Sequence, residues 1–166
     1  MSSRVAALSG ALLMLAACSS TPDQTSGAGG PGMGGAGMGG VSGAPSYGPG
    51  SQQDLAATAG DRVFFQFDSS EITSEAQQIL QRQAQWLKRY PNVSVTLDGN
   101  CDERGTREYN LALGERRANA AKNVLVALGV PASRLSTISY GKERPSVPGS
   151  SDDAYAQNRN AITNVN

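Results

Sequence analysis

A polar segment near the middle of the chain, residues 98–110, concentrates side chains that could bind a small charged molecule. Asp102 offers a carboxylate, which can hold an ammonium group. Arg104 and Arg117 offer planar guanidinium groups, which bind carboxylates through two parallel hydrogen bonds. These residues predict a pocket for a zwitterion, a molecule with both an ammonium and a carboxylate. The alternative, which spacing does not exclude, is that they form ion pairs with one another on a solvated surface.

Some of the residues in and just after this polar segment are predicted to lie on a helix. Asn110, Leu113 and Arg117 are spaced i, i+3 and i+7, so they share one face of a helix near its amino end. The amino end of a helix also attracts anions. The segment follows a predicted strand, and ligands of proteins built from sheets and helices often bind at the carboxyl ends of strands.

The composition of the chain excludes several classes of function. There is no histidine among the 166 residues, which removes Ser-His and Cys-His nucleophiles, a histidine general base and histidine-liganded metals. Two cysteines are too few for a disulfide framework or a four-cysteine zinc site. We expect neither a metal nor a cofactor. With 14 basic and 14 acidic residues the net charge is zero, which argues against binding to nucleic acid, because such surfaces usually carry excess lysine and arginine.

Cys101 lies inside the polar segment and permits two interpretations. A cysteine here could be a nucleophile or a redox sensor. The chain has no histidine to activate it, however, and the neighbouring carboxylates of Asp102 and Glu103 disfavour a thiolate. We therefore expect Cys101 to be a small packing residue.

The elements that must position these residues follow from the hydrophobic pattern of residues 61–166. Alternating or consecutive β-forming residues predict strands, and apolar residues at three- and four-residue spacing predict helices. The predicted helices span residues 74–90, 109–128 and 152–157, and the predicted strands span 63–67, 93–97, 135–140 and 160–165. The main order, β-α-β-α-β-β, predicts an α/β fold of the α+β type, with a single mixed sheet and two main helices packed against it.

The first 60 residues have a different character. Residues 1–17 combine a positive charge with an apolar run too short for a membrane-spanning helix, which is typical of a signal peptide. The run ends in Leu-Ala-Ala-Cys18 and resembles a bacterial lipobox, so we expect a lipid anchor on Cys18; the serine after it favours the outer membrane. Residues 18–60 hold most of the 20 glycines and predict a flexible tether. Residues 61–166 remain as the globular domain.

Four stretches within residues 61–164 resemble the OmpA-like peptidoglycan-binding domain family in order and in spacing: FFQFDSSEI, GNCDERGTREYNLALGERRAN, ISYGKERP and QNR. The resemblance implies a ligand, the peptide stem of uncrosslinked peptidoglycan, recognised mainly through the ammonium and carboxylate on one carbon of diaminopimelate. For lipid-anchored members it also implies an outer-membrane protein whose domain faces the periplasm. Such a protein would be part of the Tol-Pal system, would bind TolB and other Tol proteins, and would support envelope integrity and cell division.

The resemblance also implies roles for individual ligand contacts. Asp102 matches the family's aspartate for the diaminopimelate ammonium, and Arg117 matches its arginine for the carboxylate. Asp68 and Arg104 match further contacts, and Leu113 matches an apolar one.

Two asparagines, Asn100 and Asn110, are expected to brace the loop rather than to contact the ligand. The chain departs from the family at Asn100-Cys101, where His-Ala is frequent, and at Asn160, where a second arginine is frequent. Asparagine can donate and accept hydrogen bonds but cannot become cationic, so these departures bear on ligand preference and on pH dependence.

Three functions stay open on the sequence. The first is a lipid-anchored module that joins the outer membrane to the cell wall, and the second is primarily a module for TolB with weak peptidoglycan binding. The third is a peptidoglycan hydrolase, which would need a paired acid and base, whereas carboxylates among arginines should stay ionised. We expect binding without catalysis. We also expect that replacing Asp102 or Arg117 by alanine removes binding with little unfolding.

Overall fold

The computed structural model describes residues 47–166. The predicted signal peptide, Cys18 and most of the predicted tether therefore lie outside the described residues. Within the part that is described, no helix combines the length and the apolar character that crossing a membrane would require.

The described residues form one open, mixed sheet of four strands together with helices. In chain order the elements are α1 (Gln52–Thr58), β1 (Arg62–Phe64), α2 (Ser74–Arg89), β2 (Val95–Asn100), α3 (Arg107–Ala127), the 3-10 helix η1 (Ala132–Arg134), β3 (Leu135–Gly141), α4 (Asp152–Asn158) and β4 (Asn160–Val165). The strand order is β1-β4-β2-β3. β2 and β3 are parallel, whereas β4 is antiparallel to both of its neighbours. The predicted mixed sheet with two main helices is confirmed.

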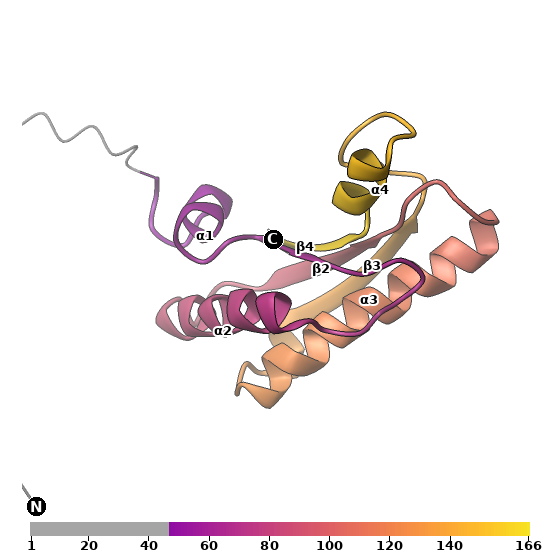
Figure 1. Ribbon diagram of the computed structural model, residues 1–166. Coiled ribbons are helices and arrows are strands. Elements are labelled where there is room, and N and C mark those ends of the chain that lie inside the picture. The colour runs from indigo at the N-terminus through magenta and orange to yellow at the C-terminus, as the bar shows by residue number, and fades with distance from the viewer. Residues whose placement is uncertain (1–46) are drawn as a thin grey trace, which may run out of the picture. The chain divides into compact units, whose positions relative to one another are not determined.

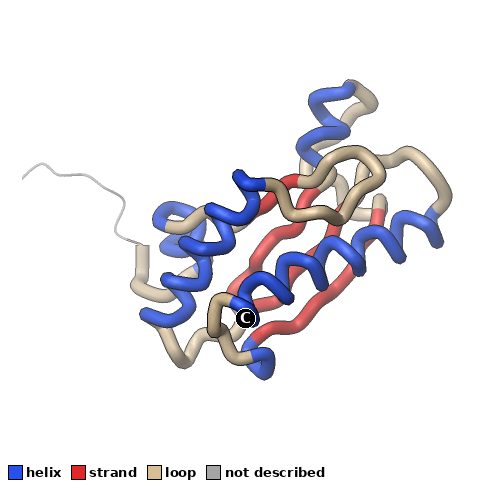
Figure 2. The backbone as a smooth tube through the Cα atoms, turned by 60° about the horizontal axis from the view of Figure 1, so that its bottom comes forward, coloured by secondary structure: helices blue, strands red, loops and turns tan. Residues whose placement is uncertain are grey.

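The two long helices, α2 and α3, lie against one face of the sheet, and α4 lies on the other side (Figures 1 and 2). The core fills the space between these helices and the strands. Leu80 and Leu87 of α2, Leu97 of β2 and Leu125 of α3 are all fully buried there. Because apolar residues recur at helical spacing along α2, one face of that helix supplies much of the core.

Two glycines allow α3 to approach the sheet closely. A Cβ atom on Gly99 of β2 would lie 1.9 Å from the backbone oxygen of Gly114 in α3. A Cβ atom on Gly114 would lie 2.3 Å from the hydroxyl oxygen of Ser139 in β3. No larger residue fits at either position without moving the helix away from the strands. This contact holds the first half of α3 against the end of β2, where the polar segment begins.

The structure corrects the predicted end of the tether at residue 60, because α1 lies within that stretch. Ser51 caps the helix by accepting a hydrogen bond from the backbone N–H of Asp54 (3.2 Å). Leu55 is fully buried in the core, and the indole N–H of Trp86 in α2 donates to the Asp54 carboxylate (3.0 Å). The folded domain therefore begins before residue 61. The hydrophobic pattern missed α1 because a single leucine is the only large apolar residue in it.

The first strand is shorter than predicted, since β1 ends at Phe64. Beyond it, the backbone carbonyls of Gln66 and Ser69 accept hydrogen bonds from the side chain of Arg117 in α3 (3.1 and 2.8 Å). Asp68, between them, has a left-handed backbone with φ of 53°, which aspartate tolerates better than most residues. The chain therefore leaves the sheet and crosses towards α3.

Candidate functional site

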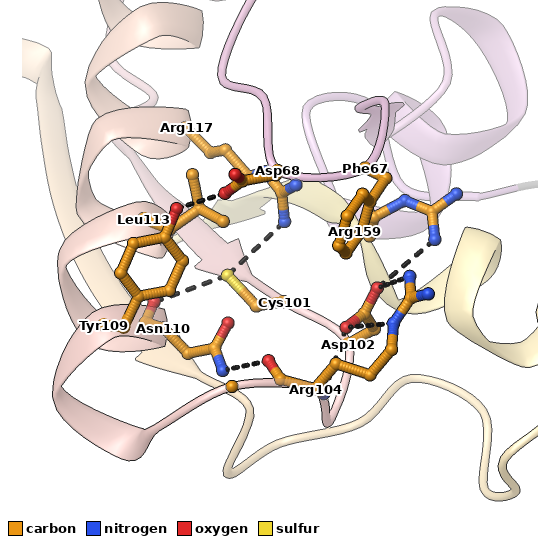
Figure 3. Close-up of a pocket in the computed structure, with 11 residues that line it drawn as sticks. Phe67, Asp68, Cys101, Asp102, Arg104, Tyr109, Asn110, Leu113, Arg117 and Arg159 are labelled. Atoms are coloured by element: carbon orange, nitrogen blue, oxygen red, sulfur yellow. Dashed lines mark hydrogen bonds and ion pairs between the residues drawn. The ribbon is translucent and has the colours of Figure 1, made fainter.

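A cavity of about 160 Å³ lies where β2 ends and α3 begins. Its walls come from the segment after β1, the β2–α3 loop and the first turns of α3, with one residue from the end of α4 (Figure 3). All five residues predicted to contact a ligand line it. The lining residues are Phe67, Asp68, Cys101, Asp102, Arg104, Gly105, Tyr109, Asn110, Leu113, Arg117 and Arg159.

The β2–α3 loop is tied to the helix that follows it by a buried asparagine. The side-chain amide of Asn110 donates to the backbone carbonyls of Arg104 (2.8 Å) and Thr106 (3.1 Å). Between these two residues Gly105 has φ of 90°, a conformation that glycine adopts without strain. Thr106 then caps α3 by accepting from the N–H of Tyr109 (3.2 Å). The end of the loop is thus fixed to the first turn of α3.

Asp102 is buried in the wall of the cavity, with 4% of its surface exposed. Arg104 donates three hydrogen bonds to its carboxylate, and the closest joins Nη2 to Oδ2 at 2.6 Å. Arg159, at the end of α4, donates a fourth at 3.3 Å. Burial by itself would raise the pKa of Asp102, but these hydrogen bonds outweigh it, so the pKa lies below its ordinary value. Asp102 is therefore ionised, and a hydrogen bond already occupies each of the four acceptor positions of its carboxylate.

Arg117 lies deeper, with none of its surface exposed. Its guanidinium donates to the backbone carbonyls of Ser69 (2.8 Å), Asn100 (2.9 Å) and Gln66 (3.1 Å), and to the sulfur of Cys101 (3.4 Å). Burial lowers the pKa of Arg117 from its ordinary value. These four contacts use four of the five N–H groups of the side chain. Arg117 therefore joins the segment after β1 to the end of β2, and one Nη2 proton remains.

Arg104 is the most accessible of the three arginines at the cavity, with 40% of its side chain exposed. Its guanidinium carbon lies 4.2 Å from the ring centre of Phe67 and 4.5 Å from that of Tyr155. Contacts between a guanidinium and an aromatic ring are attractive. Arg104 thus covers Asp102 from the solvent side and forms the most exposed charged part of the cavity wall.

The opposite side of the cavity combines a charged, a polar and an apolar residue. The phenol of Tyr109 donates a hydrogen bond to the carboxylate of Asp68 (Figure 3). Leu113, one turn further along α3, is 5% exposed and presents apolar surface to the cavity. Three guanidinium groups (Arg104, Arg117 and Arg159) and the two carboxylates leave one net positive charge around the cavity. Within residues 47–166, no cluster of three metal-ligating side chains is present.

The sequence of this domain matches a known family. A sequence model of the OmpA family covers residues 64–159, which is more than half of the chain. The chain belongs to the OmpA family. Among its relatives, the peptidoglycan-associated lipoprotein of Agrobacterium fabrum is 53% identical over 91% of this chain and 81% of that protein. The protein of the same name from Haemophilus influenzae is 41% identical over 93% of this chain and 92% of that protein.

Two solved structures are similar to this chain in fold. The peptidoglycan-associated lipoprotein from Burkholderia pseudomallei superposes with a TM-score of 0.62 at 42% identity, covering 64% of this chain and 90% of that one. The C-terminal domain of Helicobacter pylori MotB gives a TM-score of 0.60 at 24% identity, covering 64% and 84%. The second likeness is one of fold alone.

Besides Gly105, which has no side chain, three residues that line this cavity had no predicted role. Arg159 belongs to the QNR stretch but had no predicted role, because nothing in the sequence places it against Asp102, 57 residues earlier. Phe67 and Tyr109 also line the cavity, and neither was predicted to contact a ligand. The sequence did contain a signal for Phe67. It is a large apolar residue at the predicted end of a strand, directly before Asp68, which was predicted to contact the ligand.

One predicted residue lies elsewhere. The side chain of Asn100 does not line this cavity; it lines a second one, on the face of the sheet away from α2 and α3. Its amide donates to the backbone carbonyl of Asp98 (3.2 Å) and to the side chain of Asn160 in β4 (2.9 Å). Asn100 thus connects two strands, whereas its backbone carbonyl is the part that Arg117 contacts.

Replacing Cys101 by alanine is expected to preserve both the fold and ligand binding. The thiol is 3% exposed, burial raises its pKa, and its sulfur lies 3.4 Å from the carbonyl oxygen of Asn110. A protonated, enclosed thiol is a poor nucleophile. We expect the free energy of unfolding to change by about 1 kcal/mol or less, because a thiol forms only weak hydrogen bonds. Thermal unfolding and sedimentation with purified sacculi test this. Failure to bind sacculi with an unchanged circular dichroism spectrum would give the thiol a functional role.

Proposed function

We propose that this chain is a lipoprotein of the outer membrane that binds peptidoglycan without covalent bonds and without catalysis. The observation that carries the proposal is the gathering of Asp102, its ion-pair partners Arg104 and Arg159, and the buried Arg117 around one small cavity. Anionic and cationic groups so close together suit a zwitterion. The names of the relatives, which associate those proteins with peptidoglycan, support this choice of ligand.

The ligand group that fits the cavity is the amino-acid end of diaminopimelate in an uncrosslinked peptide stem. Its carboxylate would meet the remaining Nη2 proton of Arg117, at the most enclosed end of the cavity. Its ammonium would take over part of the place that Arg104 now occupies on Asp102, because that carboxylate already accepts four hydrogen bonds. The exposed Arg104 would swing aside, while Arg159 stays to keep Asp102 ionised. Leu113 would contact the aliphatic part of the ligand.

Ion pairing within the cavity also argues against hydrolysis. A hydrolase with two carboxylates needs one of them protonated near neutral pH. The pKa of Asp102 lies below its ordinary value, and its nearest charged neighbours are arginines rather than a second carboxylate. Asp102 therefore suits the holding of an ammonium better than the donation of a proton.

A second role for the same surface is the binding of a protein, and we propose TolB as that partner. Two aromatic side chains at the cavity are unusually exposed, Phe67 at 61% and Tyr109 at 45%. Exposed aromatic residues beside an arginine are typical of the centre of a protein interface. Because this surface surrounds the peptidoglycan cavity, the two partners would compete. Such competition would let a protein of the Tol-Pal system release the cell wall and move during cell division.

Sedimentation of the chain from residue 19 onward with purified sacculi tests peptidoglycan binding. We expect the protein to sediment with sacculi and to be released by an added diaminopimelate-containing peptide. The same peptide with its diaminopimelate carboxylate amidated should release far less. Protein that stays in the supernatant would overturn the proposal, and soluble fragments liberated from labelled sacculi would indicate a hydrolase instead. Adding TolB to the sedimenting complex tests the competition.

Replacing Cys18 by alanine is expected to abolish lipidation of the full chain, because only the cysteine sulfur can form the thioether to diacylglycerol. Lipid anchoring matters for function, since confinement beside the cell wall raises the effective concentration of a weak binding site. Metabolic labelling with palmitate tests the prediction. A variant labelled as strongly as the wild type would show that the lipobox assignment is wrong.

A further inference from the structure

A second cavity, of about 210 Å³, lies on the face of the sheet away from α2 and α3. Its floor is formed by neighbouring positions on three strands, since Arg62 of β1 is paired with Ile162 of β4, which is paired with Asp98 of β2. Asn100 and Asn164 extend this floor, and residues 144–146 form one wall. None of its lining residues belongs to the first cavity.

Asn100 presents a buried acceptor without a donor. The residue is 2% exposed, and its amide nitrogen is oriented by two acceptors, the carbonyl of Asp98 and the side-chain oxygen of Asn160. The orientation of Asn160 is fixed in turn, because its own nitrogen donates to the carbonyl of Gln157 (2.6 Å). Rotating either amide would therefore bring two acceptors together. Among the described residues, Oδ1 of Asn100 is the one buried side-chain oxygen or nitrogen without a hydrogen bond.

The carboxylate of Asp98 stands two residues before Asn100 on the same face of β2, because side chains alternate along a strand. It is 7% exposed. Its Oδ2 accepts from the amide of Asn164 (2.8 Å) and pairs with Arg144 (3.5 Å), whereas no hydrogen bond from a described residue reaches Oδ1. Burial raises the pKa of Asp98, which shows that its neighbours compensate the charge incompletely. This part of the cavity therefore has two acceptor atoms, Oδ1 of Asp98 and Oδ1 of Asn100, that no described donor reaches.

The same cavity also has donors to spare. Arg62 forms no ion pair with any described residue, and the side chain of Arg144 is 65% exposed, with its guanidinium 4.6 Å from the ring centre of Tyr140. The hydroxyl of Ser146 accepts from Asn160 (3.1 Å), which leaves its own proton available. Ile162 adds an apolar patch between Arg62 and Asp98. A cavity of amino-acid size is thus lined both by unmet acceptors, on Asp98 and Asn100, and by guanidinium groups, on Arg62 and Arg144.

We propose that this second cavity binds an α-amino-acid zwitterion, with its ammonium on Asn100 Oδ1 and Asp98 and its carboxylate on Arg62 and Arg144. A simple anion would leave the acceptors unpaired, and a simple amine would leave the arginines unpaired. A metal ion would meet one carboxylate beside two guanidinium groups, which is an unfavourable site. The ligand is either a free amino acid or the unlinked amino-acid end of a cell-wall peptide. The proposal is independent of the function proposed for the first cavity.

Titration of the ¹⁵N-labelled chain from residue 19 onward with D-alanine tests this, followed by two-dimensional NMR. We expect saturable shifts at millimolar ligand for the side-chain amides of Asn100 and Asn164 and for the backbone of β4. Acetate and ethylammonium, which carry one charge each, should shift these signals at least about tenfold less effectively, since a charged hydrogen-bond partner is missing. Unlinked peptide stems tested in the same way separate a cell-wall ligand from a free amino acid.

Two variants sharpen the test. D98N keeps the shape of the side chain and removes its charge, and R144A removes a side chain that is 65% exposed. Each should weaken D-alanine binding at least about tenfold, whereas D153N, at an exposed position on α4, should not. Absent or unsaturable shifts, equal shifts with acetate alone, or unchanged binding in both variants would overturn the proposal. Sacculus sedimentation, run in parallel, shows whether the first cavity works regardless of this outcome.

Discussion

Replacing Asp102 by asparagine is expected to abolish most sacculus binding. Asparagine has the same shape but offers one acceptor and no charge, so an ammonium loses its only buried counterion in the cavity. The change also leaves Arg104 and Arg159 facing one another without the carboxylate between them. We expect binding to fall at least about tenfold, because a hydrogen bond between charged groups contributes roughly 1.5–3 kcal/mol. Sedimentation with sacculi measures the loss, and D153N serves as the control for a lost surface charge.

The effect of D102N on the free energy of unfolding should depend on pH. Since the pKa of Asp102 is lowered in the folded protein, its ionised form stabilises the fold above the ordinary value of 3.8. This stabilisation is lost as the pH falls through the lowered pKa. The wild type should therefore lose stability over that acidic range more steeply than D102N. Urea unfolding at a series of acidic pH values measures the difference. Parallel curves for the two proteins would show that Asp102 is not held ionised by its arginine partners.

Replacing Arg117 by lysine is expected to weaken both the fold and the binding of sacculi. A lysine ammonium cannot reach the carbonyls of Gln66, Ser69 and Asn100 together, because these lie on two separate segments around the guanidinium. Leaving two of these buried acceptors without a donor should cost about 2–6 kcal/mol, at roughly 1–3 kcal/mol for each. The sequence-based expectation of little unfolding is therefore replaced by a large loss of stability. Thermal and urea unfolding measure it, and the exposed Arg89, replaced by alanine, provides a matched control.

Loss of binding must be separated from loss of folding in this variant. Binding is therefore measured at a temperature where circular dichroism shows the R117K protein to be folded, with the amidated and unamidated peptides as competitors. We expect the wild type to prefer the unamidated peptide and R117K to show almost no preference, because Arg117 is the residue that meets the carboxylate. A folded R117K protein that retains the preference would make Arg117 a structural residue only.

The main architecture could be predicted because it rests on local patterns. α2 repeats apolar residues at helical spacing, and β2 alternates between buried and half-buried residues over its first positions. The spacing of Asn110, Leu113 and Arg117 correctly placed three side chains at one cavity, since a regular helix fixes their relative positions. These features depend on residues that are close together in the sequence.

What could not be predicted depends on distant partners or on the backbone. Arg159 reaches Asp102 because β4 returns the chain to the centre of the sheet beside β2, an order that hydrophobic periodicity does not encode. The bonds of Arg117 end on backbone carbonyls, which every residue possesses, so no side-chain pattern reveals them. α1 is stable through Leu55 and its contacts with distant elements, and its own residues give only a weak helical signal.

The position of α1 determines how the domain bears a mechanical load. Tension applied to the chain before residue 47 reaches the sheet only through this helix, which is held by Leu55 and by the side chain of Gln52 on Thr163 and Val165. Peeling away its seven residues would lengthen the chain by about 13 Å, as the rise per residue grows from helical to extended. Under tension α1 would therefore unfold and lengthen the chain before the force deforms the ligand cavity. Pulling single molecules between residue 47 and Asn166 should show this short extension ahead of the main rupture, and a single rupture without it would contradict the assignment.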